Sequence, residues 1–332
     1  MVPIERARRI LFIRTDRLGE TLLNLPAMAA LKAGLPEASL SLLAHPDLQP
    51  LFSRITLIDR VIPCPEDRTR VWWARARRLA RTLQPHHFDL AVISNPKKEL
   101  HLAAWLAGIP WRVGYARKWG WLLTHRLHDR KALGERHEVE YNLDLVGALG
   151  FPVSIPQWSF PRFEHEEVEV LQLLAQQGIK TSEPLIVVHP WTSNPVKQWP
   201  VARFAELIRR VIERLSIRVV VIGGPEERDQ AQAVLPAGLP VVNLVGRLTL
   251  NQLAALLARA RALVSNDSGP VHLAAAVKTN TLVLFGASSP ATGPRRWGPW
   301  GEGHVVIWKP SMEAIAVEDV FAALKRQLAV QP

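Results

Sequence analysis

Short apolar runs alternate with longer amphipathic segments along the whole 332-residue chain. Charged or turn residues bound each apolar run, and uninterrupted apolar runs of this kind are typical of buried parallel strands. The predicted strands are residues 10–13, 38–43, 61–62, 89–94, 185–188, 218–222, 241–245, 262–264 and 281–285. The predicted helices are residues 22–33, 71–83, 164–177, 201–215, 249–260, 271–277 and 312–328. Because strands and helices alternate, we expect two doubly wound α/β domains with parallel sheets.

A proline-rich segment separates the two predicted domains. Residues 151–162, FPVSIPQWSFPR, contain three prolines, and proline at this density ends regular structure and stiffens a linker. We therefore expect an N-terminal domain over residues 1–165 and a C-terminal domain over residues 166–332. The closing helix of the second domain could pack back on the first. Ligands of open parallel sheets bind at the carboxyl ends of the strands, so the loops that follow the strands are where we look for chemistry.

Charge is unevenly distributed between these halves. Residues 1–165 hold 24 Lys and Arg against 16 Asp and Glu, a net charge of +8, whereas residues 166–332 hold 17 against 14, a net charge of +3. A basic half attracts polyanions such as nucleic acid, an anionic membrane surface or a phosphorylated substrate. Charge alone does not choose among these partners.

The remaining composition points to a cytosolic protein. No apolar run reaches the roughly 18 residues of a membrane-spanning helix, and charged residues interrupt the first apolar run, so no signal peptide is expected. The single cysteine, Cys64, excludes an intrachain disulfide and a thiolate zinc cluster, and agrees with a reducing compartment.

The strongest candidate site lies in residues 262–286, ALVSNDSGPVHLAAAVKTNTLVLFG. A strand, a polar glycine turn and a helix N-terminus follow one another, and such a turn offers free backbone N–H groups and the positive end of the helix dipole to an anion. Asp267 or Ser268 is expected to cap the helix, and His272, one turn in, could donate to a bound phosphate. Taken alone, the stretch is equally consistent with a well-capped helix in an ordinary βαβ unit.

Further phosphate binders follow other strands of the second half. Thr192, Ser193 and Lys197 supply hydroxyl and ammonium donors after residues 185–188, and Gly223-Gly224 follows residues 218–222. Glu226 lies where a carboxylate could hold a ribose diol. Together these residues predict a nucleotide-diphosphate donor. Because no DxD-type carboxylate pair is evident, Lys197, His272 and helix amides would have to stabilise a leaving diphosphate.

The first loop of the N-terminal half argues against a dinucleotide cofactor. Residues 14–21, RTDRLGET, contain one glycine instead of the GxGxxG of an NAD site, so an NAD dehydrogenase is disfavoured. Glu20 is either a catalytic carboxylate or a residue that favours the helix dipole. The helix at 71–83 carries four arginines and Trp72-Trp73, which suits either an anionic membrane surface or a solvated face.

The chain resembles glycosyltransferase family 9, the ADP-heptose:lipopolysaccharide heptosyltransferases. The segments that carry the resemblance are ILFIRTDRLGETLLNLPAMAALK (10–32), RVGYARKWGWLLTH (112–125), HEVEYNLDLVGALG (137–150), VVHPWTSNPVKQWPVARFAEL (187–207), VIGGPEERDQA (221–231) and SNDSGPVHLAAAV (265–277). The last segment is the most specific. The resemblance implies a GT-B fold, in which two Rossmann-like domains face a central cleft.

The implied reaction is an inverting, metal-independent transfer of heptose from ADP-heptose to the inner core of lipopolysaccharide, on a Kdo or heptose acceptor and without a cofactor. Glu20 matches the general base of the family, which more often has Asp, and Trp191 stands where many members have Gly. Lys197 and Asp267 match residues that bind phosphate and heptose, and with Glu20 they form the implied catalytic set. The implied donor-binding residues are Thr192, Ser193, Lys197, Glu226 (or Glu227, for ribose), Leu248 (for adenine), Asp267, Ser268, Gly269 and His272.

On the acceptor side, basic residues are candidates for binding phosphate or Kdo carboxylate groups: Arg14, Arg17, Lys97, Lys98 and Arg112. The resemblance implies a monomer at the cytoplasmic face of the inner membrane, in peripheral contact with it and without a nucleic-acid partner. A related GT-B glycosyltransferase that uses another nucleotide sugar for a different surface glycan stays open as an alternative. A nucleic-acid-binding protein is the alternative from another class, but the basic residues are scattered over many elements.

Overall fold

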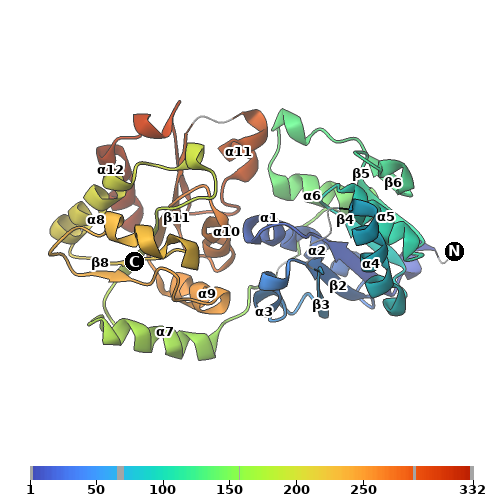
Figure 1. Ribbon diagram of the computed structural model, residues 1–332, viewed down its shortest axis with the longest axis horizontal. Helices are drawn as coiled ribbons and strands as arrows, with labels where there is room; N and C mark the ends of the chain where they lie inside the picture. The colour runs from blue at the N-terminus through green and yellow to red at the C-terminus, as the bar shows by residue number, and fades with distance from the viewer. Residues whose placement is uncertain (1–2, 66–70, 157, 287–288, 330–332) are drawn as a thin grey trace. The chain divides into compact units, whose positions relative to one another are not determined.

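The computed structural model describes residues 3–65, 71–156, 158–286 and 289–329, and the chain forms two compact units, residues 1–161 and 162–332. Each unit contains one six-stranded parallel sheet flanked by helices (Figure 1). The prediction of two doubly wound parallel-sheet domains is confirmed. The division predicted from the sequence lies between residues 165 and 166, and Gln157 of the predicted linker lies outside the described residues.

The sheet of the first unit has the strand order β3-β2-β1-β4-β5-β6. Its strands are β1 (Arg9–Ile13), β2 (Ser39–Ala44), β3 (Arg60–Pro63), β4 (Leu90–Ile93), β5 (Trp111–Tyr115) and β6 (His125–Leu127). The four apolar runs predicted as strands in this half are confirmed. The pattern did not predict β5 and β6, because both lack a continuous apolar run and β6 is only partly buried along its length.

Six α-helices of the first unit flank this sheet: α1 (Leu18–Leu22), α2 (Leu25–Gly34), α3 (Gln49–Phe52), α4 (Trp72–Leu83), α5 (Lys98–Leu106) and α6 (Glu138–Gly147). α4 and α5 pack side by side over Leu11 and Ile13 of β1, while α2 packs against α6 (Figure 1). The helix predicted over 22–33 starts earlier and is divided into α1 and α2. Pro26 explains the division, because proline lacks the N–H that would continue the hydrogen bonds of α1.

The sheet of the second unit has the order β12-β11-β10-β7-β8-β9, the same order as in the first unit when its strands are counted from β7. Its strands are β7 (Leu185–His189), β8 (Arg218–Val221), β9 (Val241–Asn243), β10 (Ala262–Asn266), β11 (Thr281–Phe285) and β12 (Val305–Trp308). β10 is longer than predicted and includes Ser265 and Asn266, which are both fully buried. The edge strand β12, which alternates half-buried and exposed residues, was not predicted.

The described residues of the second unit form six α-helices: α7 (Glu164–Gln176), α8 (Val201–Leu215), α9 (Leu250–Arg259), α10 (Gly269–Ala276), α11 (Pro294–Trp297) and α12 (Val317–Ala329). α8 and α12 pack against each other over a core that includes Val188, Val221 and Leu284, and α12 also lies against β11 and β12. α12 begins later than predicted because residues 312–314 form a separate 3-10 turn.

Both sheets reverse their chain order at one point, between β1 and β4 in the first unit and between β7 and β10 in the second. In open parallel sheets of this strand order, ligands bind beyond the carboxyl ends of the strands beside the reversal. The loops after these four strands are therefore the places where each unit can hold a ligand. They include most of the residues singled out from the sequence.

Candidate functional site

In the second unit, the loops after β7 and β10 are tied together by Asn266. Its side-chain amide donates to the Pro190 carbonyl at 2.7 Å, and its Oδ1 accepts from the Trp199 N–H at 2.9 Å. Asn266 is fully buried, so these bonds hold the loop after β7 against the end of β10. We call the polar residues that these two loops present, Thr192, Lys197, Asp267 and Ser268, the β7–β10 site.

An ion pair lies at the centre of the β7–β10 site. The Lys197 Nζ and the Asp267 Oδ2 are 2.6 Å apart, and the Thr192 hydroxyl donates to the backbone carbonyl of Asp267 at 3.3 Å. The Lys197 side chain is 29% exposed and the Asp267 side chain 10%, so a ligand can still reach the ammonium. Three residues predicted from the sequence are thus brought together beside the start of α10.

Ser268 is the N-cap residue of α10, but its side chain makes no capping hydrogen bond. Its Oγ lies 3.1 Å from Nδ1 of His189 and 2.9 Å from Oγ of Ser265, both on the neighbouring strand ends. The predicted side-chain cap by Ser268 is therefore wrong, because the hydroxyl is taken by a tertiary contact. The Ser268 hydroxyl therefore does not bind the first-turn N–H groups of α10. These N–H groups lie at the end of the helix that favours an anion.

His189 is a residue of this site that the sequence analysis missed. Its imidazole is buried at the end of β7, and burial lowers its pKa to about 4, so the ring is neutral at pH 7. A neutral ring can accept from one of the two hydroxyls that it contacts. No local signal pointed to this role, because Ser265 and Ser268 are more than seventy positions away in the sequence.

The Gly223-Gly224 loop after β8 distinguishes the two candidate ribose carboxylates. The Gly224 N–H donates to the Glu227 carboxylate, so Glu227 is committed to its own loop. Burial raises the pKa of Glu227, and the neighbouring charge of Glu226 raises it further. Glu226 is exposed, and its carboxylate lies so close over Gly224 that a Cβ there would be 2.6 Å from Oε1. Glu226 is therefore the carboxylate that remains available.

Trp191 fills the space beside this loop. It is 2% exposed, and a Cβ at Gly223 would lie 2.8 Å from Cε3 of its ring. The remaining predicted residues of this half take separate positions. Ser193 is exposed in the loop after β7, Leu248 is half-buried after β9, Gly269 begins α10, and His272 is buried within α10.

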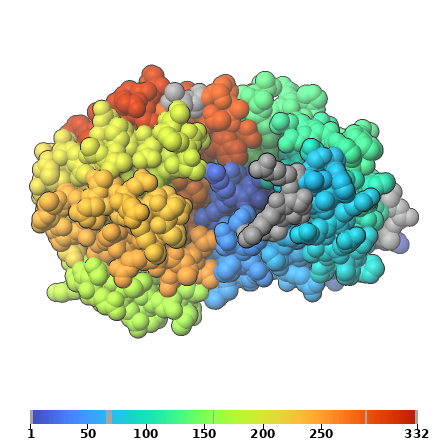
Figure 2. All heavy atoms as spheres, viewed as in Figure 1, coloured from blue at the N-terminus to red at the C-terminus, as the bar shows by residue number. Residues whose placement is uncertain are grey.

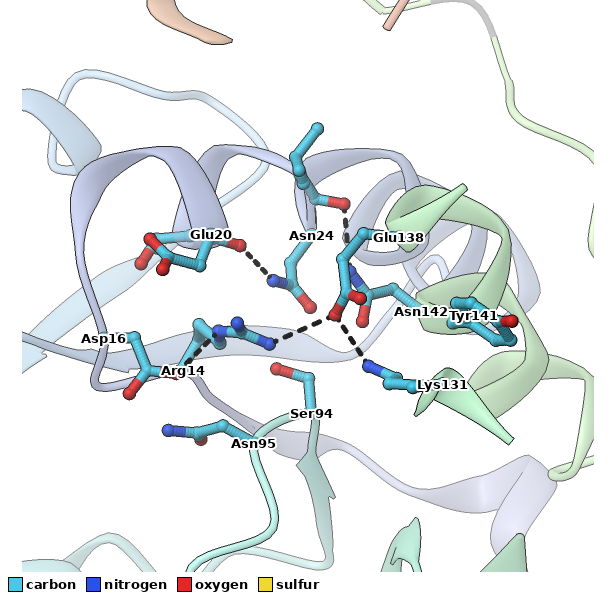
Figure 3. A network of polar contacts seen from close by, with 12 residues as sticks. Arg14, Asp16, Glu20, Asn24, Ser94, Asn95, Lys131, Glu138, Tyr141 and Asn142 are labelled. Carbon is cyan, nitrogen blue, oxygen red and sulfur yellow. Dashed lines mark hydrogen bonds and ion pairs between the residues drawn. The ribbon is translucent and has the colours of Figure 1, made fainter. Parts of the chain in front are cut away.

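In the first unit, a chain of charged groups follows the carboxyl ends of β1 and β4 (Figure 3). Lys97 Nζ lies 2.6 Å from Asp16 Oδ1, and Asp16 Oδ2 lies 3.2 Å from Nε of Arg14. Burial alone would raise the pKa of Asp16, but the charges of Arg14 and Lys97 outweigh it, and the pKa lies below its usual value. We call Arg14, Asp16 and Lys97, together with Thr15 and Asn95, the β1–β4 site.

Arg14 continues this chain into the interior. It is 5% exposed, and its Nη1 lies 3.6 Å from Oε1 of Glu138 on α6, which also accepts from Lys131 Nζ at 2.7 Å. Figure 3 shows Lys131 and Arg14 reaching Glu138 from opposite sides. The structure therefore makes Arg14 part of a buried ion network, and its predicted contact with the acceptor stays a prediction.

Glu20 lies in the first turn of α1 and is half-buried. The Asn24 side chain donates to the Glu20 backbone carbonyl at 2.6 Å, while the Glu20 carboxylate points away from that bond (Figure 3). Asn24 thus anchors the backbone of the turn and leaves the carboxylate to other partners. This placement suits a group that has to exchange a proton.

A pocket of about 220 Å³ opens beside the β1–β4 site. Thr15 and Lys97 line it, and so do three basic side chains that the sequence analysis did not assign to a site, His45, Arg75 and Arg78. Arg75 and Arg78 are three positions apart on α4 and so lie on one face of that helix, which is the signal that could have indicated them. Glu99 also lines the pocket, 3.8 Å from Arg75, but the lysine and the two arginines outnumber it, so the lining favours an anionic group.

The other predicted acceptor residues have different surroundings. The Arg112 guanidinium donates to the carbonyls of Ile109, Pro110 and Leu122, and it therefore braces its own loop. Lys98 places its Nζ 4.4 Å from the ring centroid of Trp72. Arg17 is exposed at the start of α1. These three residues do not line the pocket, and their acceptor roles stay predictions.

Comparison with known proteins gives a consistent result. Residues 76–322 match the family described as Glycosyltransferase family 9 (heptosyltransferase). The chain is 27% identical over 299 residues to Lipopolysaccharide heptosyltransferase 2 of Escherichia coli strain K12, covering 86% of this chain and 85% of that protein. It is 25% identical over 328 residues to Lipopolysaccharide heptosyltransferase 3 of the same strain, covering 95% and 92%.

Solved structures share the fold over almost the whole chain. A family 9 glycosyl transferase from Veillonella parvula superposes with a TM-score of 0.86 at 21% identity, covering 98% of both chains. The E. coli ADP-heptose heptosyltransferase II superposes with a TM-score of 0.82 at 24% identity, covering 97% of this chain and 98% of that one. E. coli heptosyltransferase WaaC with ADP superposes with a TM-score of 0.76 at 21% identity, covering 96% and 99%. The expected GT-B type of fold is confirmed.

Proposed function

The chain belongs to glycosyltransferase family 9, the heptosyltransferases, and from this premise we propose that it transfers a heptose from ADP-heptose to the inner core of lipopolysaccharide. The names of its relatives, two lipopolysaccharide heptosyltransferases of E. coli, support this donor and acceptor. The observation that carries the proposal is the Lys197–Asp267 ion pair beside the start of α10. It combines a cation with helix amides at the strand ends where sheets of this order bind ligands.

In the proposed donor complex, the diphosphate of ADP lies against the first turn of α10. The Lys197 ammonium and the Thr192 and Ser193 hydroxyls donate to its oxygens, with His272 and the amides of Ser268 and Gly269 beside them. Glu226 accepts from the ribose hydroxyls, because Glu227 already binds the Gly224 N–H. Leu248 packs on the adenine, and Asp267 accepts from heptose hydroxyls.

The proposed reaction is a single displacement. The acceptor hydroxyl oxygen attacks the anomeric carbon from the face opposite the phosphate, while the bond from that carbon to the phosphate oxygen breaks and ADP leaves with the electron pair. Glu20 takes the proton of the attacking hydroxyl, which is worth roughly 10²–10⁴-fold in rate. The configuration at the anomeric carbon inverts. Lys197 and the α10 amides stabilise the charge on the departing ADP, so the proposal needs no metal ion.

The proposed acceptor is anionic. The basic pocket beside the β1–β4 site, with Lys97, Arg75 and Arg78 on its wall, suits a phosphate or a Kdo carboxylate of the inner core. The described residues form no helix that is long and apolar enough to cross a bilayer. We propose that the protein acts as a monomer at the cytoplasmic face of the inner membrane and touches that membrane peripherally.

Glu20→Gln tests the mechanism. We expect ADP release in the presence of donor and acceptor to fall roughly 10²–10⁴-fold, while calorimetry shows ADP binding unchanged. Glu20→Asp, the residue that the family more often has, is expected to retain activity, and Glu37→Gln, at an exposed carboxylate of the same unit, serves as the control. Undiminished turnover by Glu20→Gln would remove Glu20 from the mechanism. Metal independence is tested separately: turnover that EDTA abolishes and Mg²⁺ restores would contradict it.

A second candidate function has one observation in its favour. Trp191 is buried against Gly223, next to the loop that carries Glu226, and the family often has glycine in its place. A bulkier residue there could select another nucleotide sugar, for use in a different surface glycan. Competition of ADP-heptose with ADP-glucose and UDP-sugars decides between the two: preference for a donor other than ADP-heptose would favour this second function.

A further inference from the structure

Exposed tryptophans gather on three neighbouring elements of the first unit: α4, α5 and the short 3-10 helix η4 (Gly120–Leu122). Trp73 and Trp105 are each 49% exposed, and Trp121 is 65% exposed. α4 packs along α5 (Figure 1), and α5 contacts η4. Large apolar side chains collected on one exposed surface mark an interaction site, whereas single exposed ones need no explanation. We call this surface the α4–α5 face; the atoms of the elements that carry it are light blue to teal in Figure 2.

The rings of this face form a continuous chain across the elements. The ring centroids of Trp72 and Trp119 are 4.8 Å apart in an edge-on arrangement, and those of Trp119 and Trp121 are 5.6 Å apart. Lys98 Nζ on α5 lies 4.4 Å from the Trp72 ring centroid and completes the link from α4 to α5. Trp72 and Trp119, both half-buried, therefore link α4 to the exposed Trp121 of η4, with the Lys98 ammonium beside them.

On both α4 and α5, helical spacing places a tryptophan and a basic residue on the same side of the helix. The buried side of α4 packs into the core of the unit through Ala76, Leu79, Ala80 and Leu83. The outer side of α4 carries Trp73, with the Arg77 guanidinium 5.4 Å from its ring centroid, and then Arg81 one turn further on. On α5, Lys98 and Trp105 are seven positions apart, about two helical turns, and so share one side. Each helix thus presents a tryptophan together with at least one cation.

The segment that carries this face, residues 71–121, is strongly positive. Residues 71–121 contain nine Lys and Arg against two Asp and Glu, a net charge of +7 out of +11 for the whole chain. One of the two acidic residues, Glu99, lies 3.8 Å from Arg75, and the other, Asp89, accepts from the backbone N–H groups of Arg8 and Arg9. On the face itself, Arg77, Arg81 and Lys98 lie among the tryptophans, and these cations complement a partner that offers negative charges beside an apolar layer.

We propose that the α4–α5 face docks on the surface of an anionic lipid bilayer. Indole rings are favoured at the headgroup level, where their apolar body and their N–H are both accommodated, and Lys and Arg beside them bind anionic headgroups. A single-stranded nucleic acid would need open ring faces for stacking, whereas Trp119 is in contact with a ring on each side. The inference rests on the proposed function in one respect, that the acceptor is anchored in a membrane.

Sedimentation with lipid vesicles tests this docking. We expect the protein to co-sediment with vesicles of phosphatidylethanolamine and phosphatidylglycerol in equal parts, and much less with vesicles of phosphatidylcholine, with binding that weakens as salt is raised. Arg77→Gln/Arg81→Gln is expected to lower partitioning about fivefold per charge removed. Trp105→Gln/Trp121→Gln is expected to lower it at least as much, since both rings are lost from the headgroup layer.

Matched variants of the second unit are the controls. Trp308→Gln replaces a tryptophan that is 61% exposed, and Lys325→Gln/Arg326→Gln removes two exposed charges of α12. Both are expected to partition like the native protein, and thermal unfolding checks that all variants are folded. Equal losses in the controls, no binding of the native protein to anionic vesicles, or tighter binding to a single-stranded oligonucleotide than to vesicles would overturn the proposal.

A second assay separates this inference from the proposed function. With a delipidated, water-soluble inner-core acceptor, the α4–α5 variants are expected to transfer heptose at the native rate, because no membrane is involved. Absence of transfer by the native protein, together with vesicle binding that the variants lose, would refute the function and leave the docking surface. Native transfer without vesicle binding would refute the docking surface alone.

Discussion

Lys197 and Asp267, seventy positions apart in the sequence, are joined by an ion pair of 2.6 Å at the start of α10. Each residue comes from a loop that follows a strand beside the reversal of the second sheet, and the buried Asn266 holds the two loops together. The pair keeps a flexible lysine directed at the helix N-terminus before any ligand arrives. Such preorganisation lowers the conformational entropy that binding would otherwise lose.

Lys197→Ala is expected to weaken ADP binding. A charge-assisted hydrogen bond is worth about 1.5–3 kcal/mol, which corresponds to roughly a 10- to 100-fold increase in Kd. Isothermal titration calorimetry measures the Kd for ADP of the native protein and of the variant. Lys309→Ala, which removes a more exposed lysine 3.7 Å from Asp319, is the control and should leave Kd unchanged. An unaltered Kd in Lys197→Ala would place the diphosphate elsewhere.

Glu138→Gln is expected to destabilise the first unit. Glu138 is 1% exposed and compensates both Arg14 and Lys131, so its loss removes the buried negative charge between two cations, of which Arg14 keeps its contact with Asp16. Breaking a buried ion pair in this way costs about 3–5 kcal/mol in the free energy of unfolding. Urea unfolding measures this free energy. Glu135→Gln is the control, because Glu135 forms an exposed pair with Arg130 at 3.6 Å, and a change below about 1 kcal/mol is expected for it.

Gly223→Ala is expected to lower the free energy of unfolding by about 1–3 kcal/mol, as overpacking does. The added Cβ would lie 2.8 Å from the Trp191 ring, which is buried. Trp191→Leu should relieve the clash, so the double variant should lose less than the sum of the two single changes. Strict additivity in a double-mutant cycle would show that the ring does not cause the strain.

Two buried histidines are expected to make the folded state sensitive to acid. Burial lowers the pKa of His101 and of His189 to about 4, whereas an unfolded histidine titrates near about 6.5. Between these values the unfolded chain binds protons that the folded chain does not, so stability falls as the pH drops from about 6.5 to about 4. Each histidine contributes about 3 kcal/mol over that window.

His101→Leu isolates this effect, because neither ring nitrogen of the fully buried His101 has a hydrogen-bond partner among the described residues. We expect the variant to lose less stability than the native protein between pH 7 and pH 5 in urea unfolding. His165→Leu is the control, since the His165 side chain is 81% exposed and should not alter the slope. Identical slopes for His101→Leu and the native protein would contradict the assignment.

The sequence was sufficient for the architecture because the information is local. A buried parallel strand is apolar along its whole length, and an amphipathic helix repeats its apolar positions, so ten-residue windows already identify β1, β7 and α8. The edge strands β6 and β12 were not predicted: β6, HRL, contains no apolar run, and β12, VVIW, is a short apolar run that is only partly buried in the structure. What makes them strands is pairing with β5 and β11.

The sequence also sufficed for the chemical inventory of the β7–β10 site, because Lys197, Thr192 and Asp267 follow strands whose carboxyl ends must meet at one edge of a parallel sheet. Only the tertiary structure decided how individual side chains are used. The Ser268 hydroxyl contacts His189 instead of capping α10, and Arg14 forms an ion pair with Glu138 inside the unit. A polar contact forms only when its two atoms lie within a few tenths of an ångström of the right separation. For residues far apart in the chain, that separation is reached only once the sheets have formed.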